Sequence, residues 1–353
     1  MRTPFLALLV LLTGHAGAAA TVDAAAPHVV QRYAIGGAGG WDYMSVDTQR
    51  RHVFVTRGDH VMVVDADSGS LAGDLVPIHH AHGVALVPQQ NRGYVSNGAS
   101  DSVSVFDLQT LKVTGEIPVT GKDPDAILFD PASRHVFTFN GHSDNATVID
   151  PVTQNVVTSI ELAGNPEFAV SDGRGHVFVN IEDKNQLVEI DSRKSRVSNV
   201  WSLGECDSPS GLAIDTVHAR LFSVCANRQM AVTDSHDGHA VASVPIGDGP
   251  DAVAYDAASA TVYSSNSDGT LTVVRQDDAD HYHVLANVTT PLRSRTLVLD
   301  PTTHRVFLAS AEFEPAPPTG TNERAPRPVM KPGSFALLVV AAAEPGAADH
   351  PHP

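Results

Sequence analysis

Short apolar segments recur along the chain, and polar turn residues separate them. In one stretch the segments are PDAILFD, HVFTFN, ATVID and NVVTSIEL, which together span residues 124–162. Segments of this length, alternating or continuously apolar, predict strands that pack face to face. The intervening turns are short, so we expect the four strands to form one antiparallel sheet.

The first strand of this unit recurs along almost the whole chain. Its seven copies are 41 to 44 residues apart and begin at Trp41, His82, Pro124, Pro166, Pro209, Pro250 and Ser294. A period of this length with several short strands per unit is typical of propeller blades. The pattern therefore predicts an all-β fold, a seven-bladed β-propeller of four-stranded blades that forms a single domain over residues 28–340.

The last unit lacks a fourth strand. Its segments SRTLVLD, HRVFLAS and SFALLVV supply three strands, and an insertion rich in proline and charge occupies residues 312–332. The segment HVVQRYAI, residues 28–35, has the pattern of an outer strand and precedes the first unit. We therefore expect the N-terminal strand to complete the last blade, which closes the ring and removes its exposed edges.

The two ends of the chain differ from the repeats. Arg2 precedes an apolar run over residues 5–12 and a small-residue stretch over residues 16–20. This layout predicts a secretory signal peptide over residues 1–20, too short for a comfortable membrane span. We expect an exported protein, periplasmic or secreted, that is monomeric and has no membrane span. Residues 341–353, rich in Ala, Pro and His, predict a disordered tail.

Charge and motifs exclude several kinds of function. The formal net charge is −17, so the surface repels phosphate backbones and argues against nucleic-acid binding. The same charge favours a cationic ligand. No P-loop or dinucleotide fingerprint indicates a nucleotide, and the absence of CxxCH argues against a haem c.

The chain has two cysteines, Cys206 and Cys225. Cys206 lies just before one predicted strand and Cys225 ends the next. These two ends meet in an antiparallel hairpin, so an exported protein is expected to join them by a disulfide. The alternative is a pair of reduced, buried thiols.

The strands RGYVSN and HVFTFN, the PDAILFDP segment and the VID turns resemble the YVTN repeat of YncE-like β-propellers. The resemblance extends from about residue 28 to residue 340. It implies a seven-bladed protein that is usually exported, and some members of the family are associated with nucleic-acid binding.

Candidate binding residues come from two repeat positions at one face of the ring. The second residue of each first strand is Asp42, Gly83, Asp125, Glu167, Ser210, Asp251 or Arg295, and several second strands end in Asn. Histidines from IHHAHG and from the loop after residue 140 are expected at the same face. The predicted ligand-binding residues are Asp42, His82, Asn97, Asp125, Asn140, His142, Glu167, Asp251, Asn266 and Arg295. The alternative is that the Asp and Asn side chains cap turns by bonding backbone N–H groups.

The leading interpretation is a binding protein without catalytic activity, which holds a small ligand, a metal ion or a partner protein at the channel face. Imidazoles beside carboxylates suit a transition metal, and a divalent ion is predicted at His82, Glu167 and Asp251. The alternative is a metal-dependent hydrolase or lyase. Lactonase-type propellers hold calcium with Glu, Asn and Asp, and such residue types are supplied by Glu167, Asn140, Asn266 and Asp251. No motif identifies a catalytic residue.

Overall fold

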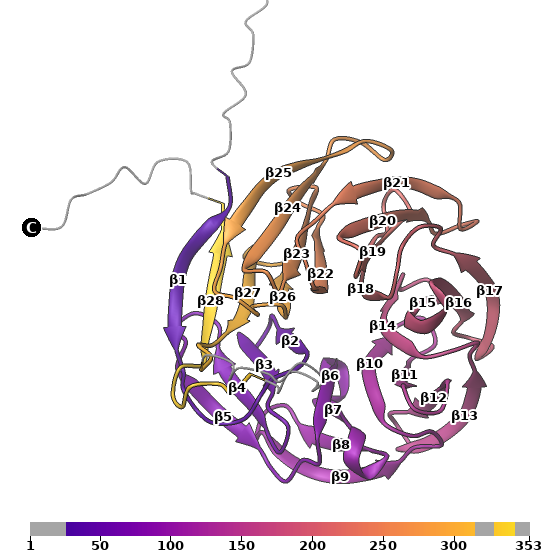
Figure 1. Cartoon of the computed structure of the whole chain (residues 1–353). Helices are drawn as coiled ribbons and strands as arrows, with labels where there is room; N and C mark the ends of the chain where they lie inside the picture. The colour runs from indigo at the N-terminus through magenta and orange to yellow at the C-terminus, as the bar shows by residue number, and fades with distance from the viewer. Residues whose placement is uncertain (1–25, 315–327, 343–353) are drawn as a thin grey trace, which may run out of the picture.

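The computed structural model describes residues 26–314 and 328–342 of the chain. The predicted signal peptide and residues 343–353 of the predicted tail lie outside the described residues. Seven four-stranded antiparallel sheets form a ring (Figure 1), which confirms the all-β, seven-bladed prediction. Among the described residues, no helix combines the length and the apolar character needed to cross a membrane.

The first three blades follow the chain from the inner strand outward. Blade one contains β2 (Met44–Asp47), β3 (His52–Thr56), β4 (Val61–Asp65) and β5 (Leu71–Leu75). Blade two contains β6 (Ala81–Val87), β7 (Arg92–Asn97), β8 (Ser102–Asp107) and β9 (Lys112–Pro118). Blade three contains β10 (Pro124–Asp130), β11 (His135–Asn140), β12 (Asn145–Asp150) and β13 (Asn155–Glu161). Short 3-10 helices are η1 (Pro88–Gln90), η2 (Gly98–Ser100) and η3 (Glu182–Lys184).

The next three blades repeat this order. Blade four contains β14 (Pro166–Ser171), β15 (His176–Ile181), β16 (Gln186–Asp191) and β17 (Arg196–Ser202). Blade five contains β18 (Pro209–Asp215), β19 (Arg220–Cys225), β20 (Gln229–Asp234) and β21 (Ala240–Pro245). Blade six contains β22 (Pro250–Asp256), β23 (Thr261–Asn266), β24 (Thr270–Gln276) and β25 (Tyr282–Thr289).

Blade seven joins the two ends of the chain. It contains β26 (Leu297–Asp300), β27 (Arg305–Ser310), β28 (Ala336–Ala341) and β1 (His28–Ala34). β1 pairs antiparallel with β28, from His28 opposite Ala341 to Ala34 opposite Ala336. The N-terminal strand is therefore the outer strand of the last blade, as the sequence predicts.

Two inner strands, β2 and β26, begin three residues later than the repeat predicts. In blade one, Thr56 N–H donates to the Tyr43 carbonyl at 3.3 Å, as a ladder requires. The Tyr43 N–H, however, donates to the His82 carbonyl of the next blade at 3.2 Å. Tyr43 thus bonds both to its own blade and to the next one, and the regular strand starts at Met44.

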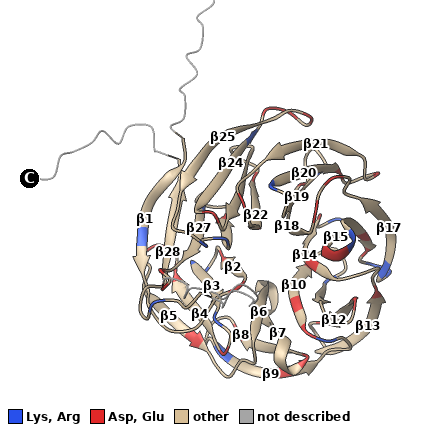
Figure 2. Cartoon of the chain, in the orientation of Figure 1, with Lys and Arg blue, Asp and Glu red and all other residues tan. Residues whose placement is uncertain are grey.

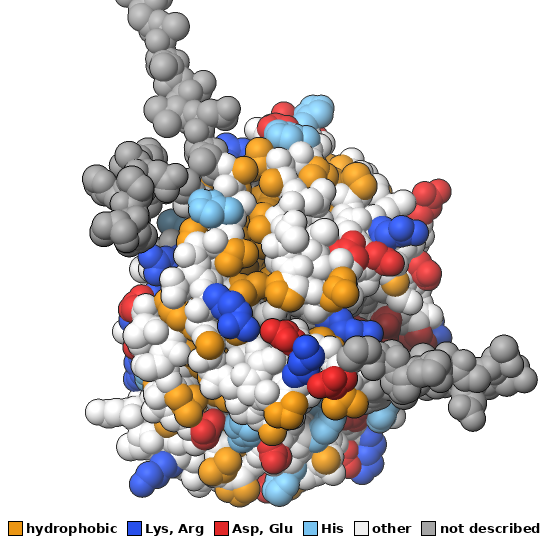
Figure 3. Space-filling model, turned by 60° about the vertical axis from the view of Figure 1, so that its left-hand side comes forward, with side chains coloured by type: hydrophobic (Ala, Val, Ile, Leu, Met, Phe, Trp, Pro, Cys, Tyr) orange, Lys and Arg blue, Asp and Glu red, His pale blue; other side chains and the backbone are white. Residues whose placement is uncertain are grey.

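The hydrophobic core lies between blades. Blades one and seven, for example, share a cluster to which β3 contributes Val55, β27 contributes Phe307 and β28 contributes Leu337. Outer strands alternate half-buried and exposed residues, as β25 does along its length. On the side of the ring that carries β1, hydrophobic side chains lie among polar and charged ones (Figure 3). The ring is thus held by contacts between sheet faces, as expected for repeats that cannot bury a face alone.

The inner strands of blades two to six share an irregularity at their start. Their pairing with the second strand shifts register immediately after the first residue, between Pro124 and Ile127 in β10 and between Pro166 and Ala169 in β14. The same shift occurs in β6, β18 and β22. A β-bulge of this kind bends a strand and re-aims a side chain. It acts here on the second residue of the strand, the position predicted to carry the site.

Candidate functional site

One residue from each blade, at or just before the start of the inner strand, belongs to a set around the channel. They are Asp42, His82, Asp125, Glu167, Ser210, Asp251 and Arg295, and we call them the ring residues. The assignment in blade two corrects the sequence prediction, which placed Gly83 there. Ala81 pairs with Asn97 as Pro124 pairs with Asn140, so His82 is the equivalent of Asp125.

A cavity of about 320 Å³, which we call the channel cavity, lies inside this ring. Six of the seven ring residues line it, all except His82, and its other lining residues are Tyr43, Phe168, Glu182, Ser208, Ala226, Pro250 and Thr296. Figure 2 shows acidic residues at the inner strands β10 and β14. The structure therefore brings four predicted carboxylates and the predicted arginine together around one cavity.

Buried polar side chains fix the backbone of the ring residues. Thr56 donates to the His82 carbonyl at 2.8 Å, and Asn180 donates to the Ser210 carbonyl at 2.9 Å. The pairs Ser96 with the Asp125 carbonyl and Ser265 with the Arg295 carbonyl are equivalent. In each pair, the donor occupies the equivalent position of the second strand in the preceding blade. Sequence analysis missed these positioning residues, although a polar residue at a fixed, buried repeat position was a usable signal.

Three carboxyl groups of the channel cavity hold protons more tightly than ordinary side chains do. Burial, together with Asp125, Glu182 and other carboxylates, raises the pKa of Glu167 to about 9. Burial also raises the pKa of Asp125 to about 7, although His82 opposes the shift. The pKa of Asp251 rises to about 6, chiefly through burial, with Arg295 opposing. The cavity therefore retains protons near neutral pH, because burial disfavours the charged forms of these carboxyl groups.

The cavity also has an aromatic wall and, among the described residues that line it, one arginine. The rings of Tyr43 and Phe168 lie 4.4 Å apart between centroids. Burial and the adjacent carboxylates raise the pKa of Tyr43 well above its ordinary value, so its hydroxyl stays neutral. Arg295 Nη1 lies 3.1 Å from Asp251 Oδ1, but half of its side chain is exposed. Asp125 Oδ1 is buried and has no hydrogen-bond partner among the described residues.

His82 lies at the rim of the channel cavity among three aspartates. Its Nδ1 is 2.7 Å from Asp42 Oδ2 and 3.6 Å from Asp125 Oδ1, and its Nε2 is 3.4 Å from Asp123 Oδ1. Burial lowers the pKa of His82, but the bond to Asp42 and the other carboxylates outweigh it and raise the pKa to about 9. His142, also predicted at this face, is 76% exposed and sits 3.2 Å from Asp123 Oδ2, outside the cavity lining.

The structure places the predicted asparagines inside their blades. Asn97 donates to Ser102 and Ser104, Asn140 donates to Asn145 and Thr147, and Asn266 donates to Thr270 and Thr272. All three are buried. They link neighbouring strands and do not line the channel cavity, so the residue types of a lactonase-like calcium site do not converge.

The predicted metal ligands His82, Glu167 and Asp251 do not form a tight group either. Three groups within the described ranges have ligand atoms within 4.8 Å of one another, and none includes Glu167 or Asp251. His82 instead groups with Asp42 and Asp125, and also with His80 and Asp123. Glu167 and Asp251 belong to the channel cavity, whereas His82 belongs to its rim.

Two further cavities adjoin the rim. One of about 610 Å³ is lined by Asp42, Arg57 and His80 among others, and one of about 560 Å³ is lined by Trp41, Arg293 and Arg295 among others. Arg57 is buried and donates to the carbonyls of Ala38, Gly39 and Gly40, which anchors the glycine-rich segment that follows β1. Asp42 therefore lines both the channel cavity and the first of these cavities, and Arg295 lines both the channel cavity and the second.

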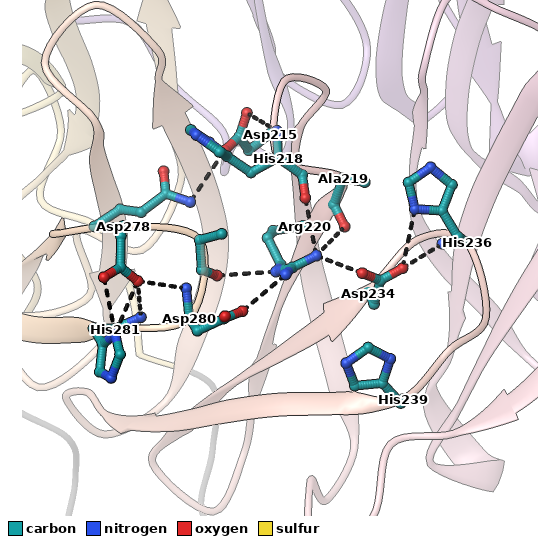
Figure 4. Close-up of polar contacts among 12 residues, drawn as sticks. Asp215, His218, Ala219, Arg220, Asp234, His236, His239, Asp278, Asp280 and His281 are labelled. Carbon is teal, nitrogen blue, oxygen red and sulfur yellow. Dashed lines mark hydrogen bonds and ion pairs between the residues drawn. The ribbon is translucent and has the colours of Figure 1, made fainter.

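The opposite end of the ring carries a separate histidine and aspartate cluster (Figure 4). Arg220 donates to Asp234 and, at 2.8 Å, to Asp280, so it links the loops after β20 and β24. A larger cavity of about 780 Å³ also lies at that end, lined by Asp256, Tyr263 and His304 among others. It contains no ring residue, so we place the candidate site at the channel cavity.

Comparisons with known proteins agree on the fold. A family profile described as "Lactonase, 7-bladed beta-propeller" matches residues 43–158, about a third of the chain. A sequence search of curated proteins found no match. Among solved structures, the chain is similar to Kuenenia stuttgartiensis hydrazine synthase, with a TM-score of 0.67 and 19% identity over 78% of this chain and 93% of that one. At this identity the similarity concerns the fold alone, and a propeller fold hosts many functions.

Proposed function

We propose that the protein is a binding protein whose channel cavity takes a small organic cation, an amine in the first instance. The carrying observation is that Asp125, Glu167 and Asp251, from three different blades, line one cavity of about 320 Å³. An ammonium group there gains the carboxylates as partners. The volume exceeds that of a bare ion, and the face of Phe168 or Tyr43 suits a cation.

Export is part of the same proposal. The signal peptide over residues 1–20, the single propeller over residues 28–340 and the tail after it remain proposals about chain organisation. The disulfide between Cys206 and Cys225 is consistent with an oxidising compartment. The resemblance to YncE-like YVTN-repeat propellers is likewise proposed, and a monomer is expected.

Neutralising one carboxyl group tests the binding site. We expect Asp251→Asn to weaken binding of putrescine or spermidine by at least tenfold, since a desolvated charge pair contributes about 2 kcal/mol or more. Glu167→Gln should do the same only at alkaline pH, where the Glu167 carboxyl group, with its pKa of about 9, is ionised. At a pH where the replaced carboxyl group is ionised in the wild type, each variant should keep or slightly raise its melting temperature without ligand, because like-charge repulsion falls. Isothermal titration with chelator present gives the affinity, and a thermal melt gives the stability.

The matched control is Glu161→Gln, which changes an exposed glutamate on the outer strand β13. It should bind amines as the wild type does. If the wild type binds no amine, or if the two cavity variants bind normally and lose about 1 kcal/mol of stability as turn caps do, the proposal is wrong.

Amine binding should strengthen as pH rises from about 6 to about 9. The pKa values of Asp251, Asp125 and Glu167 are raised to about 6, 7 and 9, so these groups lose their protons across this range. A protonated carboxyl group is neutral and attracts no cation, whereas an amine with a pKa near 10 remains charged. Titrations at several pH values measure the trend, and an affinity independent of pH would contradict the assigned protonation states.

A second candidate is hydrolysis of a lactone, favoured by the profile match over residues 43–158. Asp125, with a pKa of about 7, suits a general base that activates water, and the neutral Glu167 suits an acid that protonates the leaving oxygen. Acid release from a panel of lactones, lost in Asp125→Asn, would favour this candidate. Amine binding without lactone turnover favours the binding protein.

A further inference from the structure

We propose that the rim of the channel holds a transition-metal site of the zinc class, with His80, His82 and Asp123 as its ligands. His80 Nδ1 lies 3.1 Å from His82 Nε2, and His82 Nε2 lies 3.4 Å from Asp123 Oδ1. One ligand atom from each of the three residues lies within 4.8 Å of the others. The residues come from two separate segments, just before or at the start of β6 and just before β10.

The spacing of these atoms fits a tetrahedral ion. Metal–nitrogen and metal–oxygen bonds of about 2.0–2.2 Å place the ligand atoms of a tetrahedron roughly 3.3 Å apart. Both measured separations, 3.1 Å and 3.4 Å, are close to this value. Two imidazoles and one carboxylate favour zinc, cobalt, nickel or copper over calcium and magnesium, which prefer oxygen ligands alone.

The surroundings of His82 match the support that metal-bound histidines receive. Asp42 Oδ2 is 2.7 Å from His82 Nδ1, so Nε2 is the ring nitrogen that faces the metal position. Such a carboxylate orients the ring and makes it a better ligand. Asp125 Oδ1, which is buried and has no hydrogen-bond partner within the described ranges, lies 3.6 Å from the same Nδ1 and adds negative charge.

Backbone hydrogen bonds hold the ligands His80 and Asp123 in place. Gly98 N–H donates to the His80 carbonyl at 2.9 Å, and Gly141 N–H donates to the Asp123 carbonyl at 3.0 Å. The Asp123 N–H donates to Asp101 Oδ1 at 3.0 Å. His80 also lines the cavity of about 610 Å³, so an ion can reach the site from solvent. Three protein ligands leave one position for water or a ligand, the arrangement of reactive zinc sites.

The cluster at the opposite end of the ring is a less suitable metal site than the rim, so a variant there serves as a control for the rim variants. Its group comprises Asp234, Asp237 and His239. Asp234 already forms an ion pair with Arg220, and its Oδ1 accepts the His236 N–H at 2.8 Å (Figure 4). Asp237 and His239 are exposed, with 67% and 57% of their side chains accessible. Asp234 is thus neutralised by Arg220, and the side chains of Asp237 and His239 are largely hydrated.

The rim site does not rest on amine binding, so the two proposals fail separately. The test uses the full mature chain, stripped of metal with a chelator and titrated calorimetrically with Zn²⁺ in the absence of amines. Co²⁺ then reports the geometry through the visible absorption of tetrahedral cobalt. We expect one strong site, weakened at least thirtyfold by His80→Ala or Asp123→Asn. Asp42→Asn, which removes the support of His82, should weaken it by about tenfold to a hundredfold.

The control variant His239→Ala should bind Zn²⁺ as the wild type does. All variants are compared by circular dichroism and thermal melting, so a folding defect is recognised, and His80→Ala changes an exposed side chain. A wild type without a strong zinc site overturns the proposal. Wild-type affinity in both ligand variants, or loss of binding in His239→Ala, overturns it as well.

Discussion

A chain that begins at residue 36 should fail to form a stable propeller, whereas one that begins at residue 26 should fold. The deletion removes β1, which pairs with β28 along its length, and exposes the edge of that strand. Val29, Tyr33 and Ile35, which pack against the hydrophobic core, are lost with it. Their burial contributes roughly 3–6 kcal/mol, comparable to the total stability of many domains. We expect aggregation or a loss of the cooperative melt.

Tyr33, in the outer strand of blade seven, contacts the turn between β4 and β5 of blade one. Its hydroxyl donates to the Asp67 carbonyl at 2.8 Å, and its ring covers Gly69, where an added Cβ would lie about 2.1 Å from the ring. The intermediate variant Tyr33→Ala should therefore lower the melting temperature without preventing folding. The control Val30→Ser changes an exposed residue of the same strand and should leave stability nearly unchanged. A soluble truncated chain with wild-type stability would rule out the closing role of β1.

Loss of the disulfide is expected to lower the free energy of unfolding by about 3 kcal/mol. Cys206 and Cys225 are joined across 19 residues of sequence, and chain-entropy arithmetic for a loop of this length yields that value. Both sulfurs are buried with Leu212 and Phe178 between blades four and five. Reduction should lower the melting temperature by several degrees and leave a folded ring, since six blades are untouched.

Thiol titration and a double variant separate the bond from its packing. Unfolded, unreduced protein should show no free thiol, because the structure contains the predicted bond. Cys206→Ala with Cys225→Ala should be destabilised slightly more than the reduced wild type, since it also loses buried sulfur atoms. Two reactive thiols in the unreduced protein, or an unchanged melting temperature on reduction, would contradict the stabilising role.

The identity of the carboxylates could be predicted, but their setting could not. Asp42, Asp125, Glu167 and Asp251 occupy one repeat position, and the repeat alone placed them at one face. Tyr43 and Phe168 directly follow Asp42 and Glu167, but the other units carry Gly, Ala or Thr at this position, so the repeat does not predict an aromatic wall. The IHHAHG segment indicated that histidines lie at this face, but nothing local showed that His80 meets Asp123 or that Glu182 lines the cavity.

The prediction for blade two shows where repeat alignment fails. Aligned by its hydrophobic pattern, HGVALVP puts Gly83 at the ring position, yet the pairing of Ala81 with Asn97 puts His82 there. The unit in blade two begins at Ala81, one residue before the start expected from the sequence, because Ala81 takes the place that proline holds in blades three to six. The asparagines were misjudged in a related way: they end strands at the binding face but bond within their own blades.

The sequence by itself determined the number of blades, their four-stranded form, the closing strand and the disulfide. These follow from local periodicity, because alternation specifies strands and a constant repeat specifies identical units. Only the tertiary structure decided which side chains meet. Bulges turn single residues toward the channel, and side chains such as Thr56 and Asn180 hold the backbone of the next blade. The charge state of the cavity depends on burial and on residues from several blades, so it cannot be predicted from any single segment of the sequence.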